Sequence, residues 1–189
     1  MTTIVVVKKN GIAAIAGDSL TSFGNVRLGA DMDVSSDKIT MHQGSYIGIA
    51  GSAAHQLVIE SVLRRRPELS FRGRVDIFES FRQLHPVLKD EHFLNPKEED
   101  DDPYESSQLT ALIANASGIF GIYSMREVFE YSRFWAIGSG REFAIGAMYS
   151  CYESELDAAQ IAKRGVEAGA EFDSGSSLPM TLYTIPLER

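Results

Sequence analysis

The chain has 189 residues, of which 44% are hydrophobic and 23% charged, a composition that fits one globular domain spanning residues 1–189. Its formal net charge of -8 gives no overall attraction to phosphate and argues against a nucleic-acid partner. No apolar run approaches the length of about 20 residues that a membrane span needs, and no signal-peptide pattern opens the chain. The single cysteine, Cys151, rules out an intrachain disulfide and suits a reducing compartment. We therefore expect a cytoplasmic protein without a membrane partner.

The chain opens with a predicted β-hairpin. Its first strand is β-branched, the dipeptide Asn10-Gly11 is typical of a tight hairpin turn, and a second apolar run follows. After this hairpin, a polar, glycine-containing segment extends to Ser36, and two more strands are expected around the turn His42-Gln43-Gly44. The four strands predicted in this half are 3–7, 12–16, 38–41 and 46–50.

Two helices are predicted next. Apolar residues recur at helical spacing from Leu57 and the helix should end before Pro67; the same spacing returns over 75–88, where Pro86 is expected to kink the helix or mark its end. The strongly acidic segment Asn95–Ser107 is expected to be an exposed loop. Its consecutive carboxylates lack the alternating spacing of a calcium site.

The second half repeats the pattern of strands followed by paired helices. Alternating strand, helix-pair, strand, helix-pair and strand segments predict an α+β protein with stacked sheets in the middle and helices outside, because each sheet needs both faces covered. The predicted strands are 109–115, 118–124, an extended pair within 128–137, and 180–185, and the predicted helices are 142–152 and 156–172.

Thr2 is the first candidate for chemistry. Removal of Met1 by an aminopeptidase is plausible before a small residue and would leave Thr2 with a free α-amine beside its own hydroxyl. An α-amine has a pKa of about 7.7 to 8.0, so near neutral pH it can accept the hydroxyl proton, and one residue supplies nucleophile and base. The alternative is that a β-branched residue simply opens a strand, and the dipeptide alone favours that alternative.

The stretches 2–5, 9–11 and 15–18 resemble the N-terminal segment of proteasome β subunits and of HslV, the bacterial proteasome-type peptidase. In that family an aspartate after the second strand and a lysine at the third lie against the threonine. Asp18 and Lys38 match them by position, although the loop before Lys38 is longer than in the family. The resemblance implies that the Lys38 ammonium lowers the pKa of the Thr2 hydroxyl and that Asp18 holds the ammonium in place. Otherwise Asp18 is a turn residue and Lys38 an exposed strand end; weaker candidates for the lysine role are Lys8, Lys9 and Arg27.

The remaining catalytic positions also come from the resemblance. The segment 49–52 resembles the one whose glycine donates its N–H to the oxyanion, which implies this role for Gly51. The turn 138–140 resembles a family turn whose serine lies beside the N-terminal amine, which implies this role for Ser139. For the acidic residue and serine near the C-terminus we favour Glu171 and Ser174, since the preceding helix then matches without a gap; the alternative register uses Asp173 with Ser176.

The resemblance further implies a four-layer αββα sandwich of the N-terminal nucleophile hydrolase fold, without a metal or organic cofactor. It implies stacked hexameric or heptameric homo-oligomeric rings, unfolded protein or peptide substrates, and leaves open an ATPase unfoldase as partner. The apolar floor of the expected specificity pocket predicts cleavage after apolar or aromatic residues. The residues expected to line this pocket are Thr21, Ser22, Ile49 and Ala53.

Three functions compete at this point. The first is a threonine endopeptidase with Thr2 as the nucleophile. The second is a small-molecule amidase on the same scaffold, against which the short chain without large insertions argues. The third is a weakly active or non-catalytic ring subunit, against which the N-terminal threonine and the lack of an N-terminal helical extension argue.

Overall fold

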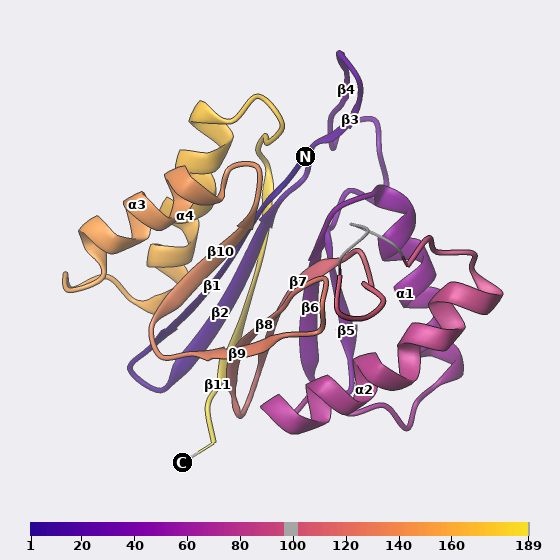
Figure 1. Ribbon diagram of the computed structural model, residues 1–189. Helices are drawn as coiled ribbons and strands as arrows, with labels where there is room; N and C mark the ends of the chain where they lie inside the picture. The colour runs from indigo at the N-terminus through magenta and orange to yellow at the C-terminus, as the bar shows by residue number, and fades with distance from the viewer. Residues whose placement is uncertain (97–101, 189) are drawn as a thin grey trace.

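The computed structural model describes residues 1–96 and 102–188, which form four layers (Figure 1). Two β-sheets lie face to face in the middle. Helices α3 (Arg141–Cys151) and α4 (Ala158–Phe172) cover the outer face of one sheet, and α1 (Ala53–Arg65) and α2 (Arg74–Pro86) cover the outer face of the other. The expected αββα sandwich is confirmed.

The first sheet is antiparallel, with the strand order β10-β1-β2-β11. The hairpin of β1 and β2 turns at Asn10 and Gly11, whose φ angles of 50° and 77° are those of a type I′ turn, as the dipeptide predicts. Side chains of β1 alternate between the layers: Val5 and Val7 pack under α3 and α4, whereas Ile4 and Val6 pack against the second sheet. The strands are β1 (Thr3–Lys9), β2 (Ile12–Asp18), β10 (Phe134–Gly138) and β11 (Met180–Pro186).

The second sheet is also antiparallel and has the order β5-β6-β7-β8-β9. The two sheets approach closely at Gly48, where an added Cβ would lie 2.8 Å from Cγ2 of Ile4. Leu112 and Ile119 are fully buried in the layer between the sheets. The strands are β5 (Ile39–His42), β6 (Ser45–Ala50), β7 (Thr110–Asn115), β8 (Gly118–Ile122) and β9 (Val128–Tyr131).

Two local features differ from or refine the sequence-based expectation. A short hairpin of β3 (Thr21–Phe23) and β4 (Val26–Leu28) interrupts the segment expected to be irregular up to Ser36. Its strands are three residues long and contain no buried residue, so no periodicity marks them. Pro86 is the last residue of α2, and a π-helical turn, η1 (Val87–Glu91), continues from it. Of the acidic segment Asn95–Ser107, residues 97–101 lie outside the described residues.

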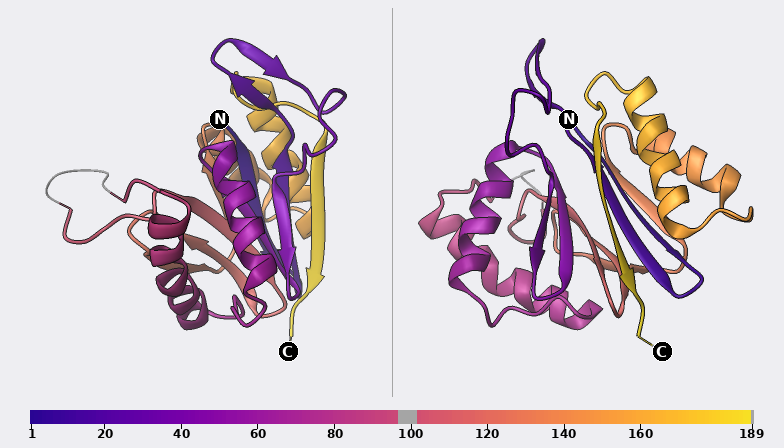
Figure 2. Two further views of the ribbon diagram at one scale, coloured as in Figure 1. Left: turned by 90° about the vertical axis from the view of Figure 1, so that its right-hand side faces the viewer. Right: turned by 180° about the vertical axis from the view of Figure 1, so that it is seen from behind.

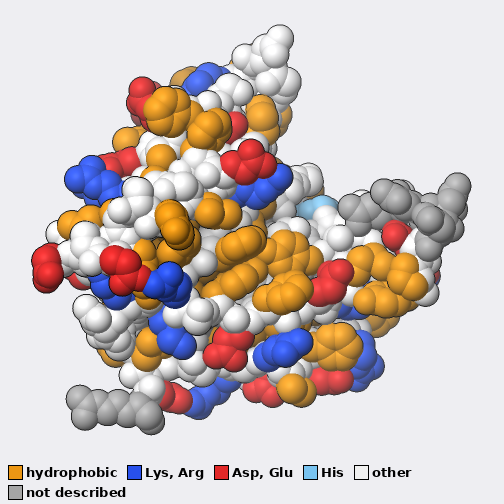
Figure 3. All heavy atoms as spheres, turned by 60° about the vertical axis from the view of Figure 1, so that its left-hand side comes forward, with side chains coloured by type: hydrophobic (Ala, Val, Ile, Leu, Met, Phe, Trp, Pro, Cys, Tyr) orange, Lys and Arg blue, Asp and Glu red, His pale blue; other side chains and the backbone are white. Residues whose placement is uncertain are grey.

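The start of β1 and the end of β2 lie at the same end of the sandwich, because β1 and β2 pair with Ile4 opposite Gly17 (Figure 2). The segment leading into β5 reaches the same end. At the side of the molecule, the edge strands β9 and β10 carry the exposed aromatic residues Phe129 and Trp135. Figure 3 shows hydrophobic side chains gathered on this face. Within the described residues, no helix is long and apolar enough to cross a membrane.

Candidate active site

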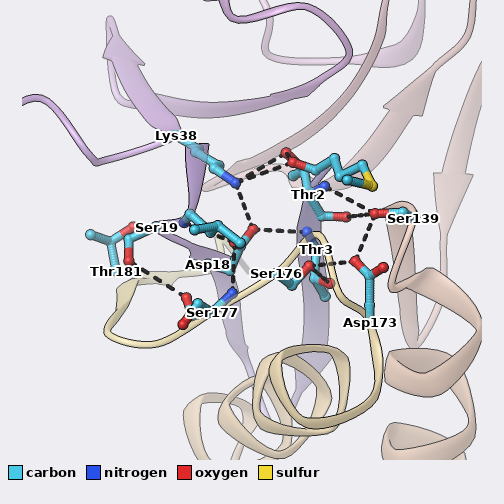
Figure 4. A network of polar contacts seen from close by, with 12 residues as sticks. Thr2, Thr3, Asp18, Ser19, Lys38, Ser139, Asp173, Ser176, Ser177 and Thr181 are labelled. Atoms are coloured by element: carbon cyan, nitrogen blue, oxygen red, sulfur yellow. Dashed lines mark hydrogen bonds and ion pairs between the residues drawn. The ribbon is translucent and has the colours of Figure 1, made fainter. Parts of the chain in front are cut away.

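Thr2, Lys38 and Asp18 meet at the N-terminal end of β1 (Figure 4). The Lys38 ammonium donates a hydrogen bond of 3.1 Å to Oγ1 of Thr2 and one of 2.8 Å to Oδ1 of Asp18. Thr2 is only 5% exposed, and the side chains of Lys38 and Asp18 are 10% and 0% exposed. The structure thus brings the three residues into direct contact in a buried position, rather than leaving Asp18 in a free turn or Lys38 on the surface.

The Asp18 carboxylate is held by four donors. Besides Lys38, its Oδ1 accepts the backbone N–H of Thr3 at 2.9 Å, and its Oδ2 accepts those of Leu20 at 3.0 Å and Ser177 at 3.1 Å. Several hydrogen bonds to a buried carboxylate fix it in position. Asp18 therefore provides a stationary negative charge against which the ammonium is oriented.

Two effects act on the protonation of Lys38. Burial lowers its pKa below 10.5, while the charge and hydrogen bond of Asp18 raise it; burial has the larger effect. The pair is oriented and largely removed from water, which strengthens its field at Oγ1 of Thr2. The competing candidate Lys9 lies elsewhere: its ammonium donates to the carbonyl oxygens of Tyr152, Ser154 and Leu156.

A second hydrogen-bonded chain reaches the backbone nitrogen of Thr2. The Thr2 N–H donates to Oγ of Ser139 at 3.2 Å, and the Ser139 hydroxyl donates to Oδ2 of Asp173 at 2.7 Å. Ser176 donates to the same oxygen at 2.8 Å and lies 2.7 Å from Oγ1 of Thr3, whose hydroxyl can then donate to Ser176. The side chains converge from the ends of β10 and α4 on the start of β1 (Figure 4).

The structure does not bring the favoured acidic residue and serine, Glu171 and Ser174, to Ser139. Glu171 lies in the last turn of α4 and Ser174 in the turn that follows, and both are exposed. Asp173 and Ser176, the alternative register, are the residues joined to Ser139 and Thr3. The physical reason is the helix end: α4 stops at Phe172, and the non-helical backbone of Asp173 turns its side chain back toward the first sheet.

The ionised form of Asp173 is favoured. Its partial burial raises the pKa, but hydrogen bonds from Ser139, Ser176 and the backbone N–H of Gly175 outweigh this, so the pKa lies below 3.8. An ionised Asp173 can only accept hydrogen bonds, so both serine hydroxyls point their protons at it. The lone pairs of Ser139 are left facing the nitrogen of Thr2.

A cavity of about 840 Å³ opens beside Thr2. Gly51 lines it at φ +144°, a backbone conformation that favours glycine. The structure brings all the expected pocket residues, Thr21, Ser22, Ile49 and Ala53, to the same cavity. Sequence reasoning missed the polar lining residues Asp33, Asp37, Gln56 and Glu60.

Met1 occupies the mouth of the site. The Thr2 hydroxyl donates to the carbonyl oxygen of Met1 at 2.5 Å, and Lys38 lies 3.5 Å from the same oxygen. The Met1 side chain packs on Gly175: a Cβ added to Gly175 would lie 2.1 Å from Cβ of Met1. In this form the nitrogen of Thr2 is an amide and cannot act as a base.

Comparisons with known proteins find relatives that are similar over most of the chain. The chain is 38% identical to the structure titled "Thiobacillus denitrificans BPH in complex with Epoxomicin", over 99% of this chain and 100% of that chain, with a TM-score of 0.92. It is 26% identical to the ATP-dependent protease subunit HslV of Caulobacter sp. (strain K31), covering 90% of this chain and 86% of that protein. It is 28% identical to the proteasome subunit beta of Nanoarchaeum equitans (strain Kin4-M), covering 98% and 93%. No family model matches the chain.

The fold and the buried site at the start of β1 define an N-terminal nucleophile hydrolase fold. Similarity extends over nearly the full length of both chains in each of these comparisons. The chain belongs to the proteasome β-subunit and HslV family.

Proposed function

We propose that this chain is a threonine endopeptidase subunit whose nucleophile is Thr2 after removal of Met1. The observation that carries the proposal is the position of the Lys38 ammonium, 3.1 Å from Oγ1 of Thr2 and 2.8 Å from Asp18. A cation beside a hydroxyl stabilises the alkoxide that develops during attack and so lowers the pKa of that hydroxyl.

Removal of Met1 would create the base without moving the chain. The nitrogen of Thr2 is already held by Ser139, and Asp173 fixes the serine hydroxyl. Once the Met1–Thr2 bond is cleaved, this nitrogen becomes an α-amine with a pKa of about 7.7 to 8.0 before any effect of the site, low enough to accept a proton near neutral pH. Removal of Met1 would also take away the carbonyl oxygen to which the Thr2 hydroxyl donates its hydrogen bond.

The reaction then runs in two balanced steps. The Thr2 hydroxyl gives its proton to the α-amine while Oγ1 bonds to the peptide carbonyl carbon, and the tetrahedral oxyanion accepts the N–H of Gly51. The C–N bond breaks, the leaving amine takes the proton, and an ester to Thr2 remains. Water then gives a proton to the α-amine while its oxygen bonds to the ester carbonyl carbon. The bond between that carbon and Oγ1 breaks, the α-amine returns the proton to Oγ1, and the peptide leaves with a new carboxyl group.

The substrate and assembly follow from the family as proposals. An extended, unfolded peptide would lie in the cavity, with an apolar or aromatic side chain near Ile49 and Ala53, which are among its lining residues. The subunits would form stacked hexameric or heptameric rings in the cytoplasm, with an ATPase unfoldase as a further partner to be sought. The exposed aromatic residues of β9 and β10 offer an apolar surface to a neighbouring copy.

The proposal is tested with a Thr2→Ala variant and an unstructured protein substrate such as casein. Intact mass establishes first that Met1 is absent from the wild type. Hydrolysis should vanish in Thr2→Ala while size-exclusion chromatography shows the same oligomer, and Thr2→Ser should keep part of the activity. An assembled wild type without hydrolysis would support the non-catalytic ring subunit. Hydrolysis of small amides but not of casein would support the amidase.

A further inference from the structure

Asp37 precedes Lys38 and carries an unusually complete set of hydrogen bonds. Its Oδ1 accepts the Thr181 hydroxyl at 2.7 Å and the backbone N–H of Ile39 at 2.9 Å, and its Oδ2 accepts the Tyr183 hydroxyl at 2.5 Å. Its carbonyl oxygen accepts Nε2 of Gln56, on α1, at 2.8 Å. The segment entering β5 is thereby held from both the first sheet and a helix.

The bonds of Asp37 cross between the two sheets. Thr181 and Tyr183 belong to β11 of the first sheet, whereas Asp37 leads into β5 of the second. The Tyr183 ring stacks on Tyr46 of β6, with ring centroids 4.7 Å apart. The hydrogen bond to Asp37 and burial raise the pKa of Tyr183 to about 12, so its hydroxyl remains a donor at every working pH. The Tyr183 hydroxyl therefore donates to Asp37 whatever the working pH.

The hydrogen bonds from Thr181 and Tyr183 to Asp37 lie beside the ion pair of Lys38 and Asp18. In the pairing of β11 with β2, Met180 is opposite Asp18 and Thr181 is opposite Gly17. Two consecutive residues, Asp37 and Lys38, therefore bind two neighbouring points of the first sheet, Thr181 at 2.7 Å and Asp18 at 2.8 Å. A long lysine side chain has many rotamers, so a fixed Cα narrows where its ammonium can lie.

We propose that Asp37 is a positioning residue for Lys38: by tying the 37–38 segment to Thr181 and Tyr183, it fixes the ammonium between Asp18 and Oγ1 of Thr2. This inference rests on the proposed role of Thr2 as the nucleophile and adds to it a residue that does not touch the reacting atoms. The Asp37 carboxylate acts through the backbone and through β11. Catalytic effects of misplacement by an ångström reach about a hundredfold, so the hydrogen bonds of Asp37 have a measurable consequence.

The kinetic test uses Asp37→Asn in the full chain. Asparagine keeps one acceptor oxygen and loses the other, so it cannot accept both the Thr181 and Tyr183 hydroxyls as the carboxylate does. We expect kcat per folded subunit to fall by about tenfold, because the misplaced ammonium acts on the nucleophile. Asp37 also lines the cavity, so KM is measured separately, and a change in KM without a fall in kcat would contradict the inference. Asp76→Asn is the matched control. Asp76 accepts the Ser70 hydroxyl on the exposed surface of α2, and its loss should leave both constants unchanged.

Tyr183→Phe is the second variant, used if Asp37→Asn fails to fold. It removes one hydroxyl and leaves the stacked ring, so the core stays folded. It should lower kcat about threefold, and the double variant should lose less than the product of the two single effects, because both changes remove the same hydrogen bond. Crystal structures give a readout independent of activity. In Asp37→Asn or Tyr183→Phe, the Lys38 ammonium should leave the position between Asp18 and Thr2.

The outcomes separate the inference from the proposed function. If Lys38 keeps both contacts in these variants and kcat matches the wild type, the inference is overturned while the endopeptidase proposal stands. If the wild type shows no hydrolysis that depends on Thr2, the proposed function fails. The crystallographic position of Lys38 still decides whether Asp37 positions it.

Discussion

Lys38 and Asp18 form a buried ion pair, with Nζ of Lys38 2.8 Å from Oδ1 of Asp18 and neither side chain more than 10% exposed. The two charges come from different sheets, since Asp18 ends β2 and Lys38 immediately precedes β5. The pair therefore joins the two central layers at the point where Thr2 leads into β1. Its geometry underlies both the stability and the chemistry expected of this site.

Removing one partner of this pair should be costly. Lys38→Ala leaves a buried carboxylate without its cation, which typically destabilises a protein by about 3 to 5 kcal/mol. Urea unfolding measures the effect, and hydrolysis by the remaining folded protein should be undetectable. Lys163→Ala is the control, because the Lys163–Glu167 pair lies on the surface of α4 and is worth at most about 0.5 kcal/mol. Equal stabilities for the two variants would contradict the account.

The acidic residue in contact with Ser139 gives a matched pair of variants. Asp173→Asn should lower kcat by about tenfold or more, because a neutral amide oxygen accepts the Ser139 and Ser176 hydroxyls more weakly than the charged carboxylate oxygen does, and the serine beside Thr2 is held less firmly. Glu171→Gln changes an exposed side chain two residues away and should have no effect. Steady-state kinetics on a fluorogenic peptide compares them. A larger fall in kcat for Glu171→Gln than for Asp173→Asn would support the register of Glu171 and Ser174.

The dependence on pH follows from the lowered pKa of Lys38. Between its folded pKa and 10.5 the unfolded chain binds the proton more tightly than the folded chain, so the contribution of Lys38 to stability rises with pH across that window. Activity has the opposite dependence, because the ammonium is lost as pH rises through the folded pKa. We expect kcat to fall at alkaline pH with a midpoint below 10.5. In Lys38→Arg, whose guanidinium stays charged, this decline should be absent from whatever activity remains.

Close packing behind Thr2 makes another prediction. An added Cβ at Gly169, on α4, would lie 2.4 Å from Oγ1 and 2.6 Å from Cγ2 of the buried Thr3. Gly169→Ala should destabilise the fold by about 1 to 3 kcal/mol and lower activity, because Thr3 is pushed against the residue that carries the nucleophile. Gly146→Ala on α3 meets nothing within 4 Å and should be neutral or stabilise the helix by up to about 1 kcal/mol. Thermal unfolding of both variants checks this.

The sequence was sufficient where local rules decide the structure. The Asn10-Gly11 turn fixes the register of the first hairpin, and this register places Asp18 beside Thr3. Lys38 required the family resemblance, because its contact with Asp18 depends on how two sheets stack rather than on any local pattern. The placement of stacked sheets in the middle and helices outside, in contrast, followed from the alternation of strands and helix pairs.

Some features could not be predicted from local sequence patterns, because tertiary contacts determine them. Glu171 and Asp173 are two residues apart, and with about 100° of turn per residue their side chains leave a helix in nearly opposite directions, so the end of α4 decides which faces Ser139. No local sequence pattern predicts the contacts of Asp37, because its partners Thr181 and Tyr183 lie at the far end of the chain. The short hairpin of β3 and β4 has no buried face that a pattern could reveal.

The central claim is that the N-terminal residue of the mature chain, Thr2, is the nucleophile. The most direct measurement is peptide mapping by mass spectrometry of protein quenched with acid during peptide hydrolysis, which traps the ester intermediate. We predict that Met1 is absent, that the ester lies on the N-terminal peptide beginning at Thr2, and that Thr2→Ala forms none. An ester on another residue, or hydrolysis that persists in Thr2→Ala, would contradict the account.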